Sequence, residues 1–375
     1  MAGSVTASTP DRRARALALG GFVLVRALGL VALAVGGSLS GLSAHERLTR
    51  WDAQWYVHIA RHGYGMTKVV PDGRHLSDLA FFPLYPLLER LVHTVTRLPF
   101  ADAGLLVTAL ASLATALVLH DLGTRLYGVR AGLVLVLLWA AVPVGVVESM
   151  AYSEALFTLL AAGACLAVVR DKWVVAGLLA SLAGLTRPVG VAVVAGIGVA
   201  VLVRVLRRDA GWQVWAGAVM APLGWLGYLL WVGARVGDPL GYFTVAGRWG
   251  NSFDGGAAYG GWVLGFLTGS WPAPLLGLLL LAGTAAVVWL VWLGVTDRQP
   301  PVLVAYTATL VLLAFTSSGY FGSKPRYLLP AFGLLVPLAV RLSRARPAVT
   351  WPVLGALTAV ASVYGAVWLL GPGPP

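Results

Sequence analysis

Charged side chains are scarce in this sequence of 375 residues. Only 11% of the residues are Asp, Glu, Lys or Arg, whereas 58% are apolar. Because a soluble globular domain carries about 25% charged residues, this composition excludes that class. We predict an all-α membrane protein, a bundle of helices that crosses the bilayer many times.

Lysine and cysteine are scarcer still. Of the 27 basic residues behind the net charge of +12, only Lys68, Lys172 and Lys324 are lysines. Most arginines lie beside apolar segments and form no basic stripe with interleaved aromatics, so we expect topological anchors and no nucleic-acid partner. The single cysteine, Cys165, lies inside an apolar run, which excludes an intrachain disulfide and a cysteine metal site.

Patterns that bind metal ions are also missing. The sequence has no Asp-x-Asp motif, which would be expected for the cation of a nucleotide-sugar donor. His58 and His62 have the i, i+4 spacing of zinc ligands, but no third ligand stands at a suitable distance along the chain. We therefore expect neither a metal nor another cofactor.

Long apolar runs dominate what remains. A membrane helix needs about 20 residues, so 173–186 and 328–340 are short enough to be broken or half-spanning. Residues 1–16 are predicted to be a disordered cytoplasmic tail, followed by one transmembrane domain over 17–371. The eleven predicted spans are 17–39, 101–120, 131–147, 155–169, 173–186, 189–203, 212–232, 274–295, 302–317, 328–340 and 349–370.

The arginines orient these spans. With the amino terminus inside, five short connections fall on the cytoplasmic side, as the positive-inside rule requires. They hold Arg125 and Arg130; Arg170 and Lys172; Arg204, Arg207 and Arg208; Arg298; and Arg341, Arg344 and Arg346. The long first loop, 40–100, and a Gly- and aromatic-rich loop, 235–271, then lie outside. These and the shorter outer segments hold nearly all of the unusual polar residues, so we predict an extracytoplasmic functional site.

One acid in the first outer loop stands among aromatic residues. A helix through this segment would place Asp52, Trp55 and Tyr56 on one face. A carboxylate partly shielded from water by these rings and by Trp51 suits a general base. The Thr-Arg-Trp-Asp pattern that ends at Asp52 also fits a capping box, in which the acid only satisfies a helix amino terminus. The residues alone leave both interpretations open.

The same loop carries a longer pattern. The run Trp-Asp-x-x-Trp-Tyr-x-x-Ile-Ala-x-x-Gly-Tyr begins at Trp51, and Ala-Phe-Phe-Pro-Leu-Tyr-Pro-Leu-Leu begins at Ala80. Together they resemble the first external loop of bacterial PIG-V-type mannosyltransferases. These belong to the GT-C class of polytopic glycosyltransferases and are related to the second mannosyltransferase of GPI-anchor synthesis.

Three further stretches are similar to this family, each with less specificity. Tyr152-Ser153-Glu154 resembles a Tyr-Ser-Glu-Ser-Leu-Phe segment, with Ala155 in place of the second Ser. The stretch from Arg187 resembles an Arg-Ser-x-Gly segment in which Pro188 replaces Ser. The run Lys-Pro-Arg-Tyr that ends at Tyr327 looks like an Arg-Tyr segment at the mouth of a late helix.

The resemblance implies a hexosyltransferase on the outer face of the cell membrane. It would move a mannosyl unit from a polyprenyl-phosphate donor to a lipid or envelope-glycan hydroxyl, with inversion by a single displacement. Asp52 matches the position of the catalytic acid. The anionic leaving group needs cations beside this carboxylate but separate from it, and Arg187, Lys324 and Arg326 are the candidates. The remaining substrate-binding candidates are Trp51, Trp55, Tyr56, Tyr85, Glu154 and Tyr327.

Other interpretations remain for these residues and for the whole chain. The three cations could simply reach lipid headgroups, and Glu154 could be an ordinary first-turn acid facing a helix dipole. For the whole protein the alternative is a lipid or solute transporter without covalent chemistry. A transporter needs polar residues in the middle of its spans. Arg26 is the only charge deep in a predicted span.

Overall fold

Helices account for nearly all of the regular structure, which confirms the predicted fold class. The computed structural model describes residues 11–374. The first half contains α1 (Arg12–Leu39), α2 (Ala44–Leu48), α3 (Asp52–His62), α4 (Leu84–Thr96), α5 (Phe100–Tyr127), α6 (Val129–Ala140), α7 (Glu154–Val169), α8 (Trp173–Gly184) and α9 (Val191–Leu206). The second half contains α10 (Trp212–Met220), α11 (Leu223–Val236), α12 (Gly241–Arg248), α13 (Ala257–Leu267), α14 (Ala273–Thr296), α15 (Pro301–Thr316), α16 (Lys324–Tyr327), α17 (Leu335–Arg344) and α18 (Pro347–Leu370).

The predicted amino-terminal tail overlaps the start of this structure. Residues 1–10 lie outside the described part of the chain. The side chain of Asp11 accepts a hydrogen bond from the Arg13 amide and caps α1. Residues 12–16, which we predicted to be disordered, are therefore the first turns of the first apolar helix.

Six helical segments of the described chain are long and apolar enough to cross a membrane. Two bent helix pairs bring that number to as many as eight. Four shorter apolar helices of 10–17 residues accompany them. In hydrocarbon, backbone amides and carbonyls must pair within the chain, which explains why these apolar runs fold as helices. The predicted total of eleven spans stays a prediction.

The outer face of the bundle carries large apolar side chains. On α14 these include Leu275, Leu279, Trp289 and Trp292, each at least 45% exposed. Such a surface would be unstable in water and is stable against lipid tails. Charged residues are instead concentrated at helix ends and inside the protein. This distribution fits a multi-pass membrane protein.

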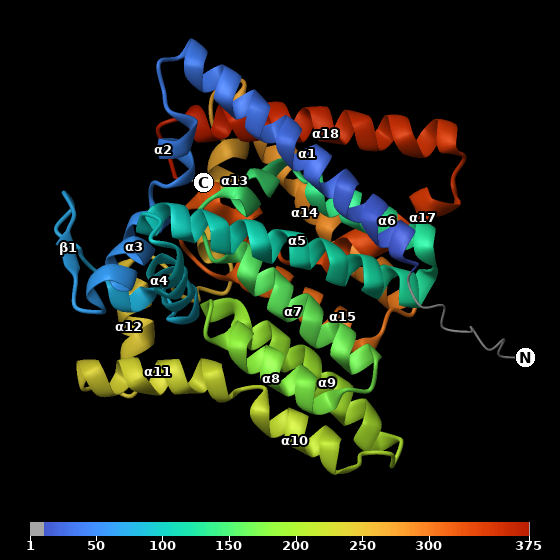
Figure 1. The fold of residues 1–375 in the computed structure, drawn as a ribbon. Coiled ribbons are helices and arrows are strands. Elements are labelled where there is room, and N and C mark those ends of the chain that lie inside the picture. Colours follow the sequence, from blue (N-terminus) through green and yellow to red (C-terminus); the bar gives the residue numbers. More distant parts are fainter. Residues whose placement is uncertain (1–10, 375) are drawn as a thin grey trace, which may run out of the picture.

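Helix α5 runs through the middle of the bundle. It packs against α1, α4, α6 and α7, while α18 lies along α1 (Figure 1). Where α5 meets α6, the backbones approach closely, since a Cβ on Gly132 would lie 2.5 Å from the His120 carbonyl oxygen. Glycine at this crossing permits the close packing typical of membrane helices.

The segment after α1 forms a separate layer at one end of the bundle, on the left in Figure 1. It contains α2, α3, an antiparallel hairpin of β1 (Thr67–Val69) and β2 (His75–Ser77), and α4. The amino-terminal end of α1 lies at the opposite end of the bundle. The predicted outer loop 235–271 contains two helices, α12 and α13. We predicted a loop here because the many glycines and aromatics of this segment obscure its helical periodicity.

One predicted span is sharply bent. Helix α6 is followed by the 3-10 helix η2 (Pro143–Ser149), which departs from it by 84°. Proline has no amide hydrogen, so Pro143 helps to end the regular hydrogen-bonding pattern there. The guanidinium of Arg26, on α1, donates to the carbonyl oxygens of Ala140 and Gly145 on the two sides of the break. Arg26, the one charge that the sequence places deep in a predicted span, thus forms hydrogen bonds with backbone carbonyls at the bend.

We predict that Arg26→Leu destabilises the protein by about 1–3 kcal/mol, the cost of leaving a buried polar group without a partner. The measurement is the apparent unfolding midpoint of the detergent-solubilised protein. Arg12→Leu, at an exposed position of the same helix, is the matched control and should change the midpoint little. Equal midpoints for the Arg26 variant and the wild type would contradict the role assigned to Arg26.

Candidate active site

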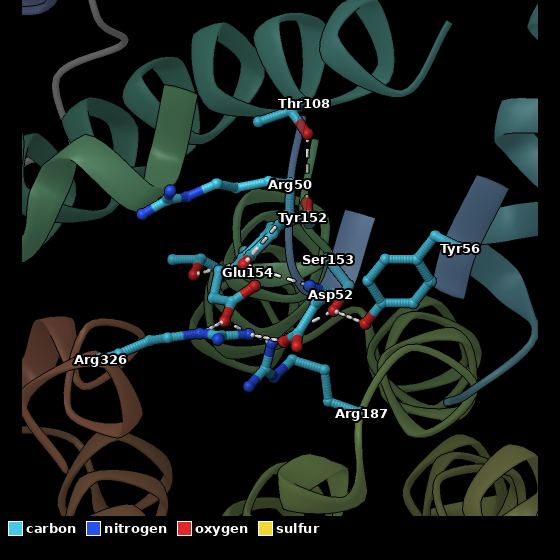
Figure 2. A network of polar contacts seen from close by, with 10 residues as sticks. Arg50, Asp52, Tyr56, Thr108, Tyr152, Ser153, Glu154, Arg187 and Arg326 are labelled. Atoms are coloured by element: carbon cyan, nitrogen blue, oxygen red, sulfur yellow. Dashed lines mark hydrogen bonds and ion pairs between the residues drawn. The ribbon is translucent and has the colours of Figure 1, made fainter. Parts of the chain in front are cut away.

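Four charged side chains from separate parts of the chain meet at the start of α3 (Figure 2). They are Asp52, Glu154, Arg187 and Arg326. An Asp52 carboxylate oxygen accepts from Arg326 Nη2 at 2.6 Å. A Glu154 oxygen accepts from Arg187 Nη1 at 2.6 Å and also from Arg326 Nε. Two carboxylates and two guanidiniums therefore balance their charges within one network, which we call the Asp52–Arg326 network.

Each member stands where a helix begins or is interrupted. Asp52 is the first residue of α3, and Glu154 is the first residue of α7, after the bend at η2. Arg187 has an extended backbone directly before Pro188, as expected for a residue that precedes proline. Arg326 lies in α16, a helix of only four residues. All four charged side chains of the network therefore lie at helix starts, at helix breaks or in a short helix, and none lies in the middle of a long helix.

The backbone is strained next to Asp52. Trp51 has a φ of 60°, in the left-handed region that a bulky side chain rarely adopts. Trp51, rather than Thr49, is the N-cap of α3, and its side chain makes no capping hydrogen bond. The Thr49 hydroxyl donates instead to the His45 carbonyl oxygen. The capping box considered from the sequence is therefore not formed, which leaves the Asp52 carboxylate available to Arg326.

The two carboxylates of the network differ in their exposure to solvent. The Glu154 side chain is 0% exposed, and its two arginine partners are at most 11% exposed. The Asp52 side chain is 28% exposed. Asp52 is therefore the accessible edge of the network and Glu154 its buried anchor.

Hydroxyl groups surround the charged side chains. Ser153 Oγ lies 2.8 Å from the Tyr56 hydroxyl and accepts from Arg187 Nη1 at 3.2 Å. The Tyr152 hydroxyl accepts from the Asp52 amide at 3.3 Å, and the Tyr152 ring lies 4.5 Å from the Arg326 guanidinium carbon. Burial raises the pKa of the Tyr56 phenol above its ordinary value, so Tyr56 acts here as a neutral hydrogen-bonding group.

The other aromatic candidates pack outside the network. Tyr85 is fully buried and donates to the Gly104 carbonyl oxygen at 2.8 Å, which fixes α4 on α5. Trp55 stacks on Phe81, with ring centroids 5.6 Å apart. The Trp51 ring joins the apolar cluster between α1 and α18.

Lys324 and Tyr327 take different positions on α16. The Lys324 ammonium donates to the carbonyl oxygens of Ala314, Ser317 and Ser318, so it caps the end of α15. Tyr327 lies within electrostatic reach of all four charged members of the network. From the sequence we expected the three candidate cations to be separate from Asp52. This was wrong for Arg326, which contacts the Asp52 carboxylate directly.

Tyr152 and Ser153 contact the network although sequence reasoning did not select them. Both lie in the Tyr-Ser-Glu motif that contains Glu154, and their closeness to Glu154 in the sequence was the available signal.

His58 and His62 were the two residues with the spacing of zinc ligands. Their ring centroids lie 5.0 Å apart. Among residues 11–374, no group of three His, Cys, Asp or Glu side chains could hold an ion.

Sequence comparison identifies relatives of the amino-terminal half. Residues 13–207 match the family model described as Mannosyltransferase (PIG-V). GPI alpha-1,6-mannosyltransferase 2 of Mus musculus is 34% identical over 166 residues, which are 42% of this chain and 31% of the mouse protein. The Rattus norvegicus protein of the same name is 33% identical over 153 residues, which are 38% of this chain and 29% of the rat protein. The chain therefore matches about a third of the length of these relatives.

Structural comparison covers nearly the whole chain. ArnT from Cupriavidus metallidurans, solved bound to undecaprenyl phosphate, aligns with a TM-score of 0.56 and 19% identity over 91% of this chain and 63% of its own. An oligosaccharyltransferase from Archaeoglobus fulgidus, solved with Zn and sulfate, aligns with a TM-score of 0.55 and 14% identity over 95% of this chain and 53% of its own. The likeness shows a shared GT-C fold.

We predict that Glu154→Gln destabilises the protein by about 3–5 kcal/mol, because it removes the buried carboxylate that pairs with both Arg187 and Arg326. Asp297→Asn is the matched control. Asp297 pairs with Arg341 at 2.8 Å, but the two side chains are 35% and 46% exposed, so its loss should cost less than about 1 kcal/mol. Unfolding midpoints in detergent measure both variants. Equal losses would show that Glu154 is not the anchor of the network.

Proposed function

Because the chain belongs to the mannosyltransferase (PIG-V) family, we propose that it transfers a mannosyl unit from a polyprenyl-phosphate donor to a lipid or envelope-glycan hydroxyl. One observation carries the proposal. A single accessible carboxylate, Asp52, lies in the same network as two guanidiniums. Transfer from a sugar phosphate needs these two functions, a base for the attacking hydroxyl and cations for the departing phosphate.

The reaction is a single displacement at the anomeric carbon. Asp52 accepts the proton of the acceptor hydroxyl, and the acceptor oxygen bonds to the anomeric carbon. The bond from this carbon to the phosphate oxygen breaks, and the polyprenyl phosphate departs with the electron pair. Arg187 and Arg326 stabilise the negative charge that collects on the phosphate. Attack from the face opposite the leaving group inverts the configuration.

The burial of Glu154 supports this mechanism over a double displacement. A retaining enzyme needs a second carboxylate that reaches the sugar as a nucleophile. Glu154 is the second carboxylate of the network, but it is fully buried and contacts both arginines. It can position the guanidiniums, while the accessible position belongs to Asp52.

The distribution of arginines supports an extracytoplasmic site. Glu154 begins α7, and Arg170 directly follows the last of its 16 residues, which corresponds to about 24 Å along the helix axis. At the Arg170 end, Arg15 and Arg170 pair with Asp121 at 2.5 and 3.3 Å. By the positive-inside rule this end faces the cytoplasm. The Asp52–Arg326 network then faces the opposite side of the cell membrane.

We predict that Asp52→Asn lowers the rate of transfer by about 10²–10⁴-fold, the usual contribution of a general base. The assay incubates purified protein with radiolabelled polyprenyl-phosphate-mannose and a membrane lipid extract, and measures labelled product. Asp72→Asn is the matched control, since Asp72 is an exposed acid in the turn between β1 and β2, where it pairs with Arg74. Undiminished transfer by the Asp52 variant would remove this residue from the mechanism.

A further inference from the structure

Arg326 engages the two carboxylates through different nitrogens. Its Nε donates to Glu154, and its Nη2 donates to Asp52 at 2.6 Å. The Tyr152 ring lies 4.5 Å from the guanidinium carbon and supports the cation. The guanidinium is therefore anchored by Glu154 and Tyr152, while its Nη2 group reaches the accessible carboxylate.

The two contacts of Arg326 differ in how readily they can be exchanged. Glu154 is fully buried, and its oxygen also accepts from Arg187, so its removal would break two ion pairs in a site with little water. Asp52 is 28% exposed, so its contact with Arg326 lies at the accessible edge of the network. A ligand that competes for Arg326 can displace Asp52 while the contact with Glu154 persists.

A phosphate group is such a ligand. Guanidinium binds phosphate oxygens through paired, charge-assisted hydrogen bonds, as it binds a carboxylate. While the contact in this structure lasts, the Asp52 oxygen that accepts from Arg326 Nη2 is engaged with the guanidinium and not with an acceptor hydroxyl. The phosphate and Asp52 need the same Nη2 group of Arg326. The pairing in this structure therefore opposes both donor binding and base catalysis.

We propose that donor binding activates the base by exchange of this ion pair. In the protein without substrate, Arg326 holds Asp52. The donor phosphate takes over Arg326 Nη2, and the Asp52 carboxylate, now released, accepts the proton of the acceptor hydroxyl. The proposal rests on the function proposed above and adds an order to it, in which the base is free only when a donor is present. After the polyprenyl phosphate departs and Asp52 releases its proton to water, Arg326 returns to the Asp52 carboxylate.

The test is a double-mutant cycle on the binding of polyprenyl phosphate, the product that carries the donor phosphate. Affinity is measured for the full-length wild type, Asp52→Asn, Arg326→Gln and the double variant, all in the same detergent. Removal of the competing carboxylate should tighten binding by about tenfold in the Asp52 variant. That gain should vanish when Arg326 is also replaced, because no guanidinium remains to be shared. Where Arg326→Gln does not fold, the neutral Arg326→Met, of similar length, takes its place.

Two controls separate exchange from simple loss of a negative charge. In an Arg187→Gln background the tenfold gain from Asp52→Asn should persist, because Arg187 contacts Glu154. Polyprenol without phosphate should bind all variants equally. No gain in the Asp52 variant, or an equal gain with and without Arg326, would overturn the exchange.

The binding cycle is independent of turnover. If Asp52→Asn loses transfer but binds polyprenyl phosphate no more tightly than the wild type, the exchange is wrong and the proposed base stands. If this variant retains transfer, the proposed base is wrong, whatever the binding data show.

Discussion

The mutual neutralisation of two guanidiniums and two carboxylates is the interaction on which the site depends. A buried charge without a partner is very costly, and removal of one member leaves the others exposed to that cost. The buried Glu154 carboxylate pairs with both Arg326 and Arg187, so it compensates part of the charge of each guanidinium. The network therefore holds together α3, α7 and α16, which are distant in sequence. Loss of the buried Glu154 would therefore loosen both arginines, whereas Asp52 lies at the accessible edge of the network.

Interrupted helices are what allow such charges to meet inside a membrane protein. A continuous span places its apolar residues throughout the bilayer and its charges at the ends. Here η2 bends away from α6, Pro188 follows an extended Arg187, and α16 is a single short turn. The carbonyl groups freed at such breaks need other partners. Arg26 satisfies those beside η2 and Lys324 those at the end of α15, so these two cations maintain the shape of the site without facing Asp52.

The sequence predicted the helical class and the residues of the network, but not how they pair. The long apolar runs that became α1, α5 and α14 were visible because a span has a minimum length. Asp52 and Arg326 were selected by chemistry and family resemblance. Their contact joins residues 274 positions apart, and no local pattern encodes such a distance. The 84° bend after α6 was hidden for a similar reason, since an apolar run looks the same straight or bent. The sequence also showed no sign that the Lys324 ammonium donates to backbone carbonyls in and just after the end of α15.

The central claim is that one network serves both the base and the leaving group. The most direct measurement is an experimental structure of the protein with bound polyprenyl phosphate. The account predicts the phosphate within hydrogen-bond distance of the Arg326 guanidinium, with Arg326 still held by Glu154 and separated from Asp52. A phosphate bound elsewhere, for example at Arg341 and Arg344 of α17, with the contact between Asp52 and Arg326 intact, would contradict it.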